Sequence, residues 1–212
     1  MRIVVLDTET TGVGPTDEVI QISTICLDEK LNIINASNDY CKISKPVPAE
    51  ATAVHGITNK TLEELSDNKY LEDHVAELDY LCDAKDTIFI GYNIAFDIEK
   101  INYSLTNAGY PPIDFGVNVN TIPKETKGNN YNICLMKSLK SYLGYPGRWR
   151  KLSAMYKTYV DIPDQVVLNL KDEIVRLSGI CPGHGADNYH DALYDTLITT
   201  LLFNNFIHFY RI

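Results

Sequence analysis

The chain of 212 residues lacks most of the features that mark secreted or membrane proteins. Its five cysteines are odd in number and widely spaced, with no Cys-x-x-Cys pair. We therefore expect reduced thiols, as in a cytoplasmic protein, rather than a disulfide framework. No apolar run reaches the roughly 18 residues of a membrane span, and Asp7 interrupts the N-terminal apolar run too early for a signal peptide. Repeats and low-complexity linkers are also absent, so we expect one domain over residues 1–212.

Basic residues are scarce as well, since 19 Lys and Arg stand against 28 Asp and Glu and the net charge is −9. This balance taken alone argues against a nucleic-acid partner. However, residues 115–160 contain eight basic side chains and one acid, so they carry +7 and leave −16 on the rest of the chain. A local basic surface suits phosphate binding, whereas the simpler alternative is a solvated face on a pair of helices. The eight are Lys124, Lys127, Lys137, Lys140, Arg148, Arg150, Lys151 and Lys157.

The order of the predicted elements indicates an α/β domain. Strands are expected at residues 2–7, 18–28, 31–43, 87–91 and 115–121. Apolar residues recur at helical spacing over 71–84, 94–108, 132–143, 151–159, 163–177 and 191–207. The early strands form a predicted hairpin and the later ones alternate with helices. We therefore expect a mixed sheet flanked by helices.

Acidic residues stand at the end of the first predicted strand. Asp7 and Glu9 alternate along the strand, so their side chains emerge on one face about 6–7 Å apart. Two adjacent anions with oxygen ligands suit a hard cation such as Mg²⁺ or Mn²⁺, although a solvated strand end explains most Asp-x-Glu pairs. The small residues Thr10, Thr11 and Gly12 follow, and they allow a nucleotide to approach the backbone closely.

Two later groups of polar residues lie at predicted helix starts. Asn93 stands where a strand gives way to a helix and is expected as its N-cap, with Asp97 just after the first turn. Asp97 is either a polar neighbour of the core or a metal ligand at the carboxyl edge of the sheet. His190 and Asp195 are about 140° apart around a helix, so they act together only if His190 precedes the helix. Asp191 shares a face with Asp195 and is either a rival ligand or the N-cap.

In this order, the groups resemble the motifs of the DEDDh exonucleases, the DnaQ-like group that includes polymerase proofreading subunits. Asp-x-Glu with Thr-Thr-Gly matches residues 7–12, Asn-x-x-Phe-Asp matches 93–97, and His-x-Ala-x-x-Asp matches 190–195. A fourth patch, Val-His-Gly-Ile-Thr at 54–58, is similar to the family's loop beside the terminal nucleotide.

The resemblance implies a ribonuclease-H-like fold with a five-stranded mixed sheet whose first three strands are antiparallel. It implies a metal-dependent 3′–5′ exonuclease that uses two divalent ions, Mg²⁺ or Mn²⁺, with His190 as general base. The implied metal ligands are Asp7, Glu9, Asp97 and Asp195. The substrate would be DNA or RNA with a free 3′ end, DNA being favoured, and the products nucleoside 5′-monophosphates. The residues expected to contact substrate are Thr10, Thr11, Gly12, His55, Ile57, Asn93, Arg148, Arg150 and Lys151.

Two departures from the family bear on partners. An extra loop over about 179–188 precedes His190 and is expected to shape access to the site. The sequence given ends 17 residues after Asp195, so we expect no long tail of the kind by which bacterial proofreading subunits contact their polymerase. Whether the protein works with a polymerase therefore stays an open question.

Three alternatives remain at this point. Cys181, His184 and His190 offer part of a zinc site, although no fourth ligand is evident and Pro182-Gly183 more simply makes a turn. A second alternative is a non-catalytic module that binds nucleic-acid ends or a protein, but the intact set of four acids and a histidine argues against it. The third alternative is an RNA-processing enzyme, because no motif encodes the contacts to the 2′-hydroxyl that would distinguish RNA from DNA.

Overall fold

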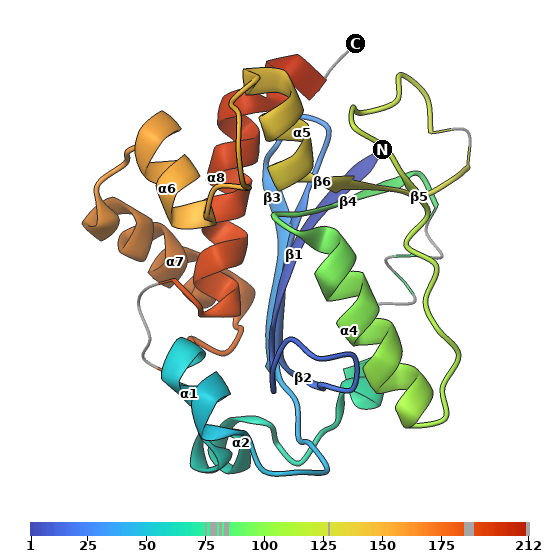
Figure 1. Ribbon diagram of the computed structural model, residues 1–212, viewed down its shortest axis with the longest axis vertical. Helices are drawn as coiled ribbons and strands as arrows, with labels where there is room; N and C mark the ends of the chain where they lie inside the picture. Colours follow the sequence, from blue (N-terminus) through green and yellow to red (C-terminus); the bar gives the residue numbers. More distant parts are fainter. Residues whose placement is uncertain are drawn as a thin grey trace.

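The computed structural model describes residues 1–74, 76, 80, 82, 85–126, 128–184 and 189–210. Within these residues a six-stranded sheet has the strand order β3-β2-β1-β4-β6-β5. Helices cover both faces of this sheet, with α4 on one side and α8, backed by α6 and α7, on the other (Figure 1). The arrangement is the predicted α/β sheet between two helical layers.

The antiparallel half of the sheet is built around the central strand β1 (Arg2–Thr10). β1 pairs with β2 (Val19–Leu27), which in turn pairs with β3 (Ile33–Tyr40), both in antiparallel fashion. The Asp28 carboxylate closes the β2–β3 hairpin by accepting hydrogen bonds from the backbone N–H groups two and four residues later. The predicted hairpin and the antiparallel order of the first three strands are confirmed.

The parallel half contains the strands that the sequence predicted least well. β1 pairs with β4 (Thr87–Gly91), β4 with β6 (Tyr131–Cys134), and β6 with the two-residue β5 (Val117–Asn118), all in parallel. The predicted helix over 132–143 was wrong in its first part, because β6 runs directly into a helix with no polar turn between them. The predicted strand over 115–121 is reduced to β5, and the sheet has six strands instead of five.

The helices predicted over 94–108, 151–159, 163–177 and 191–207 are found close to those ranges, whereas two short helices between residues 49 and 65 were not predicted. Residues 71–74 form a single 3₁₀ turn, η1 (Leu71–His74), and the described residues 76, 80 and 82 are α-helical, so the helix predicted over 71–84 differs at its start. Val75 and Leu78, on which that prediction also relied, lie outside the described residues. The α-helices with described bounds are α1 (Ala49–His55), α2 (Asn59–Leu65), α4 (Ile94–Asn107), α5 (Leu135–Leu143), α6 (Leu152–Tyr159), α7 (Asp164–Ser178) and α8 (Ala192–Tyr210).

Alternation along β1 divides the core into two layers. Ile3 and Val5 pack in the cluster that contains the buried face of α8, whereas Val4 and Leu6 pack in the cluster that contains α4. All four side chains are at most 1% exposed, so β1 is buried on both faces. Because the side-chain period of a strand is two residues, the same alternation directs later residues of β1 to opposite faces at its carboxyl end.

The described residues contain no helix that combines the length and the apolar character needed to cross a membrane. None of the five cysteines forms a disulfide, and four of them are buried. Of the predicted loop over 179–188, residues 185–188 lie outside the described part of the chain.

Gly116, directly before β5, has a backbone conformation and a close neighbour that favour glycine. Its φ is +80°, and an added Cβ would lie 1.9 Å from the carbonyl oxygen of Asn130, which is next to β6. We expect Gly116→Ala to lower the free energy of unfolding by roughly 2–5 kcal/mol, from left-handed strain plus the clash. Gly109→Ala is the matched control, because Gly109 has φ +87° and nothing within 4 Å of its added Cβ. Urea unfolding should show a loss of only about 1–2 kcal/mol for that control; equal losses in the two variants would contradict the clash.

Candidate active site

A cleft of about 520 Å³ opens at the carboxyl ends of β1 and β4. Its walls come from the end of β1, the end of α1, the start of α4, residues 149–153 and the turn that precedes α8. The lining residues are Asp7, Thr8, Glu9, Thr10, Gly12, Val13, Ala51, Val54, His55, Tyr92, Asn93, Phe96, Asp97, Met136, Trp149, Arg150, Lys151, Leu152, Ser153, Tyr189, His190 and Asp195. The four predicted metal ligands and His190 are therefore all in one cleft.

The carboxylates reach this cleft from both faces of the sheet. Asp7 and Glu9 are in phase with Ile3 and Val5, so they lie on the face that α8 covers. Asp195, in the first turn of α8, comes from the same side. This phase explains how residues far apart in the sequence place their carboxylates together.

Asp97 approaches from the opposite side, where α4 covers the sheet. Its Oδ1 accepts hydrogen bonds from the backbone N–H of Thr8 at 3.1 Å and from the Thr8 hydroxyl at 2.8 Å. Thr8 lies between Asp7 and Glu9, and its side chain points to the α4 face. The Thr8 contacts therefore fix Asp97 at the strand end, beside the carboxylates of the other face.

The crowding of acids in the cleft disfavours their ionised forms. Burial, aided by the charges of neighbouring carboxylates, raises the pKa of Glu9 to about 9 and that of Asp195 to about 7. Burial also raises the pKa of Asp97 to about 7, despite the hydrogen bonds from Thr8. The same two causes raise the pKa of Asp7 well above its usual value. The cleft consequently favours any cation that can replace these protons.

The donor atoms fit a divalent metal ion. One atom from each of Glu9, His190 and Asp195 lies within 4.8 Å of the others. Asp195 Oδ2 accepts the backbone N–H of His190 at 3.1 Å, whereas its buried Oδ1 has no hydrogen-bond partner among the described residues. A buried carboxylate oxygen is costly when left unpaired, and carboxylate oxygens are the ligands that Mg²⁺ and Mn²⁺ prefer.

His190 lies in the turn before α8, as the spacing to Asp195 required. Its φ of +72° is unusual for a residue other than glycine, and its side chain is exposed at the cleft. Partial burial and the positive charge of Lys151 lower the pKa of the imidazole. The ring is therefore uncharged at neutral pH and is able to accept a proton.

The residues predicted to contact substrate are divided by the structure. Thr10, Gly12, His55 and Asn93 line the cleft. Asn93 occupies the N-cap position of α4, but its side chain makes no capping hydrogen bond. Burial lowers the pKa of His55 to about 4, so this ring is neutral too. These residues border the space next to the carboxylates.

Thr11 and Ile57 have other partners. The Thr11 hydroxyl donates to Asp17 at 3.0 Å and accepts the N–H of Glu18, so it stabilises the turn after β1. Ile57 is fully buried in the cluster beneath α1 and α2. Neither residue belongs to the cleft lining.

The basic stretch contributes one wall of the cleft. Arg150 and Lys151 line it, and Arg148 is exposed two residues before Arg150. Trp149 and Phe96 also line the cleft; the sequence had not singled out Trp149, and Phe96 belonged to a motif that gave it no role. Their apolar character predicts positions in the core, and only the charged residues next to them in the sequence indicate an exposed position.

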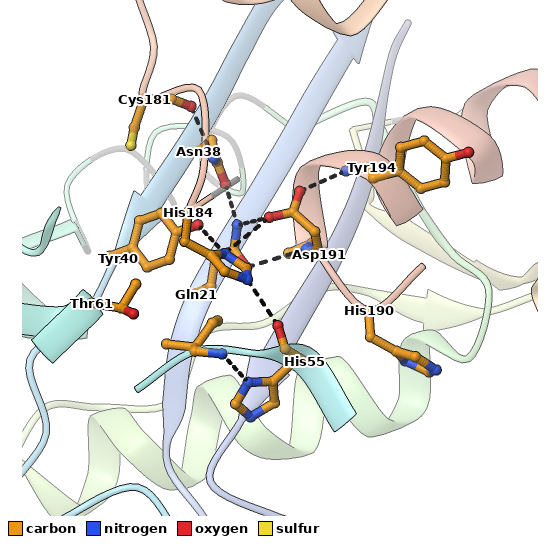
Figure 2. A network of polar contacts seen from close by, with 12 residues as sticks. Gln21, Asn38, Tyr40, His55, Thr61, Cys181, His184, His190, Asp191 and Tyr194 are labelled. Atoms are coloured by element: carbon orange, nitrogen blue, oxygen red, sulfur yellow. Dashed lines mark hydrogen bonds and ion pairs between the residues drawn. The ribbon is translucent and has the colours of Figure 1, made fainter. Parts of the chain in front are cut away.

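A buried polar network lies behind the cleft and includes His184 (Figure 2). His184 Nδ1 lies 2.9 Å from the Tyr40 hydroxyl and 3.4 Å from Asp191 Oδ2, while Nε2 lies 2.8 Å from the carbonyl oxygen of His55. His184 thereby ties residues after α7 to the end of α1 and to the residue next to His190. His190 itself points away from this network (Figure 2).

Asp191 belongs to this network and is absent from the cleft lining. Its Oδ1 accepts the N–H of Tyr194 at 3.1 Å, which confirms the predicted N-cap of α8. Its Oδ2 accepts from Gln21 at 3.1 Å, and Lys171 is 3.9 Å from Oδ1. With its oxygens engaged in this way, Asp191 is fixed as a structural acid, in contrast to Asp195.

The partial zinc site is not formed by the described residues. The only group of candidate ligands that comes together among them is Glu9, His190 and Asp195. His184 is occupied by its hydrogen bonds, and the carbonyl of Cys181 accepts from Asn38 at 2.9 Å. The Cys181–His184 turn therefore anchors the chain behind the cleft.

The fold and the carboxylate cleft define a ribonuclease-H-like nuclease of the DEDDh type. A model of the exonuclease (RNase T) family matches residues 4–165. The chain therefore belongs to this exonuclease family. One relative, 31% identical over 51% of this chain and 11% of its own length, is the 3′–5′ exonuclease DinG of Bacillus subtilis. The predicted family and fold class are confirmed, with one short edge strand more than expected.

Relatives and solved structures agree with this assignment. The chain is 32% identical over 157 residues to an uncharacterized exonuclease of Escherichia phage 186, with 69% of each protein covered. It is 32% identical over 126 residues to the DNA polymerase III subunit epsilon of Rickettsia typhi, covering 58% of this chain and 52% of that subunit. E. coli exonuclease I in complex with a dA16 oligonucleotide has the same fold, with a TM-score of 0.66 at 18% identity over 97% of this chain and 40% of that one. The chain thus spans about half the length of the epsilon subunit.

The raised pKa of Glu9 predicts the pH dependence of stability in the metal-free protein. Because folding raises this pKa to about 9, the associated stability is present at acid pH and is lost as the pH rises through that value. In EDTA, we expect the Tm of the wild type to fall more between about pH 6 and about pH 9 than the Tm of Glu9→Gln does. Glu63→Gln, on the exposed side of α2, should follow the wild type. An equal fall in Tm with pH for the wild type and Glu9→Gln would contradict the raised pKa of Glu9.

The contacts of His184 predict its contribution to stability. His184→Ala removes the hydrogen bonds to Tyr40 and His55 from a side chain that is 8% exposed. We expect a loss of about 1–3 kcal/mol in the free energy of unfolding, measured with urea. Tyr40→Phe deletes a single partner and should cost about 1 kcal/mol. A His184→Ala variant as stable as the wild type would show that the network does not anchor this region.

Proposed function

We propose that the protein removes nucleotides one at a time from the 3′ end of single-stranded nucleic acid, with DNA preferred over RNA. The observation that supports this best is a single cleft that contains four acids and the uncharged rings of His55 and His190, with Arg150 and Lys151 on its wall. The volume of about 520 Å³ is in the range of clefts that bind small ligands. A strand end, rather than a duplex, fits such a space.

The acids would hold two divalent cations, Mg²⁺ or Mn²⁺, which lower the pKa of the attacking water and neutralise charge on the leaving oxygen. The proposed ligands are Asp7, Glu9, Asp97 and Asp195. Their raised pKa values and the unpaired Oδ1 of Asp195 support this role, because both express a shortage of positive charge in the cleft.

His190 is proposed as the general base. It accepts a proton from the water whose oxygen forms a new bond to phosphorus, while the bond between phosphorus and the 3′-oxygen breaks. The products are a nucleoside 5′-monophosphate and a strand with a new 3′-hydroxyl. The lowered pKa of His190 keeps the ring ready to accept the proton near neutral pH.

Terminal selection is assigned to the residues beside the acids. The backbone at Thr10 and Gly12 would hold the terminal 3′-hydroxyl, and the neutral ring of His55 would pack against the last base. These residues line the cleft next to Asp7 and Glu9. The end of α1 also lines the cleft, and in this proposal it stops the strand from passing further, so that a free end is required.

The preference for DNA rests on the relatives. The epsilon subunit of a DNA polymerase and an exonuclease in complex with a DNA oligonucleotide are both similar to the chain. The similarity to the epsilon subunit covers 52% of that protein, so the proposal concerns the nuclease reaction and leaves a polymerase partner aside.

The decisive experiment is a time course on 5′-labelled single-stranded DNA and RNA of the same sequence, with Mg²⁺, Mn²⁺ or EDTA. We expect a ladder that shortens from the 3′ end with either metal, faster on DNA, and no reaction in EDTA. Asp7→Ala should abolish the ladder, whereas Asp172→Ala, on the exposed side of α7, should leave it unchanged. Faster cleavage of RNA would identify an exoribonuclease, and binding without any ladder would identify a non-catalytic module.

His190→Ala tests the general base. We expect kcat to fall by about 10²–10⁴-fold, while Mn²⁺ still raises the Tm of the variant because the four acids are intact. Single-turnover rates and thermal unfolding measure the two quantities. A near-normal rate would assign the base to another group.

A further inference from the structure

Trp149 is the only tryptophan of the chain, and 47% of it is exposed. It lines the cleft together with Phe96 and Met136. A large aromatic ring that is left partly in water, on the wall of a cleft, is more informative than an exposed aliphatic side chain. A ring in this position suits a ligand with a flat, apolar surface.

The ring is held in place by its own neighbours. Lys140 Nζ lies 4.4 Å from the centre of the Trp149 ring and also donates a hydrogen bond to the carbonyl of Gly147 at 2.6 Å. Lys140 is in the last turn of α5. One cation therefore fixes both the turn after α5 and the indole, so the ring is ordered before any ligand binds.

A second set of contacts joins this segment to the active site. The backbone carbonyl of Arg150 accepts the hydroxyl of Tyr92 at 2.5 Å, and Tyr92 directly precedes Asn93 at the start of α4. The guanidinium of Arg150 lies 4.7 Å from the ring centre of Tyr145. The position of Trp149 is thus set relative to the end of β4, where the carboxylate cleft begins.

The immediate neighbours of Trp149 are cationic. Arg148, Arg150 and Lys151 are all exposed, and in a chain of net charge −9 they belong to the stretch that carries +7. An aromatic ring supplies a surface for a nucleobase, and flanking cations neutralise backbone phosphates. This combination recognises an unpaired strand without reading its sequence, because every base has a flat face.

We propose that Trp149 stacks on an unpaired base of the strand whose 3′ end enters the carboxylate cleft, and that the flanking cations bind its phosphates. We name Arg148, Trp149, Arg150 and Lys151 the strand shelf. The inference rests on the proposed function for the direction of the strand, but the stacking itself is measurable without catalysis. It predicts selectivity for single strands, since a base within a duplex has no free face.

The sole tryptophan makes the stacking directly observable. In EDTA, which stops hydrolysis, single-stranded oligothymidylate should quench the emission of the wild-type protein saturably. A hairpin duplex of the same length should quench it much less. Binding is measured in parallel by anisotropy of a labelled oligonucleotide, so that the affinity is known for variants that lack the ring.

Variants separate the ring from the charges. Trp149→Ala should raise the Kd by about 5-fold to 100-fold, with the dependence of log Kd on log salt unchanged, and Trp149→Phe should recover most of the affinity. Replacing Arg148, Arg150 and Lys151 by Gln should instead reduce the slope of log Kd against log salt by about 2. Tyr110→Ala is the matched control, because Tyr110 is 45% exposed and lies outside the cleft lining.

The outcomes are distinguishable from those of the proposed function. Saturable binding by anisotropy with unchanged tryptophan emission would overturn the stacking, as would a Trp149→Ala variant with the wild-type Kd. Either result leaves the exonuclease intact if the wild type still shortens labelled DNA with Mn²⁺. Conversely, quenching without any shortening would support the strand shelf and refute the proposed reaction.

Discussion

The burial of β1 on both faces is the constraint on which the site depends. A central strand with helices above and below must carry apolar side chains at every position until it reaches the edge of the core. β1 does so from Ile3 to Leu6, and only then do acids begin. Because the strand alternates, Asp7 and Glu9 meet α8 while Thr8 meets α4. Carboxylates from α8 and α4, which pack against opposite faces of the sheet, thus meet at the end of this one strand.

The electrostatics of the molecule follow from this collection of charge. The acids of the cleft destabilise one another in the absence of a cation, which is why burial and their mutual repulsion raise the pKa values of Glu9 and Asp195. Nearby on the same cleft, Arg150 and Lys151 present the opposite sign. A net charge of −9 therefore conceals a division of charge that suits the proposed function, in which the acids hold metal ions and the basic wall binds the polyanion that the acids alone would repel.

Two sets of contacts, one behind the cleft and one in front of it, hold these groups at fixed positions. Behind the cleft, His184 and Asp191 connect the segment after α7, the end of α1 and the start of α8 through side chains that are almost fully buried. In front, Lys140 and Tyr92 fix the segment that contains Trp149. In each set, polar groups that precede or follow a helix are bonded to side chains of other segments, which is how an irregular segment becomes rigid enough to position a ligand.

The sequence by itself determined the features that depend on local geometry. The spacing of Asp7 and Glu9 on a strand, the need for His190 to precede a helix that carries Asp195, and the hairpin at Asp28 each follow from the period of one element or the chemistry of one turn. The resemblance of the three motifs to the DEDDh family was sufficient to predict the fold, since these motifs occur at fixed places in it.

Only the tertiary structure decided the features that depend on what packs nearby. β6 is a strand because β4 pairs with it, and nothing within its own four residues separates it from the helix that follows. Asp191 and Asp195 lie four residues apart, yet only one faces the cleft, because Gln21, 170 residues before Asp191, bonds to it. Likewise, the sequence does not tell whether a tryptophan is buried or exposed, because the indole has the same chemistry in a core and on a surface. Trp149 is exposed beside the acids because contacts from α5 and from the end of β4 hold its segment there, and such long-range contacts are not encoded in any local pattern.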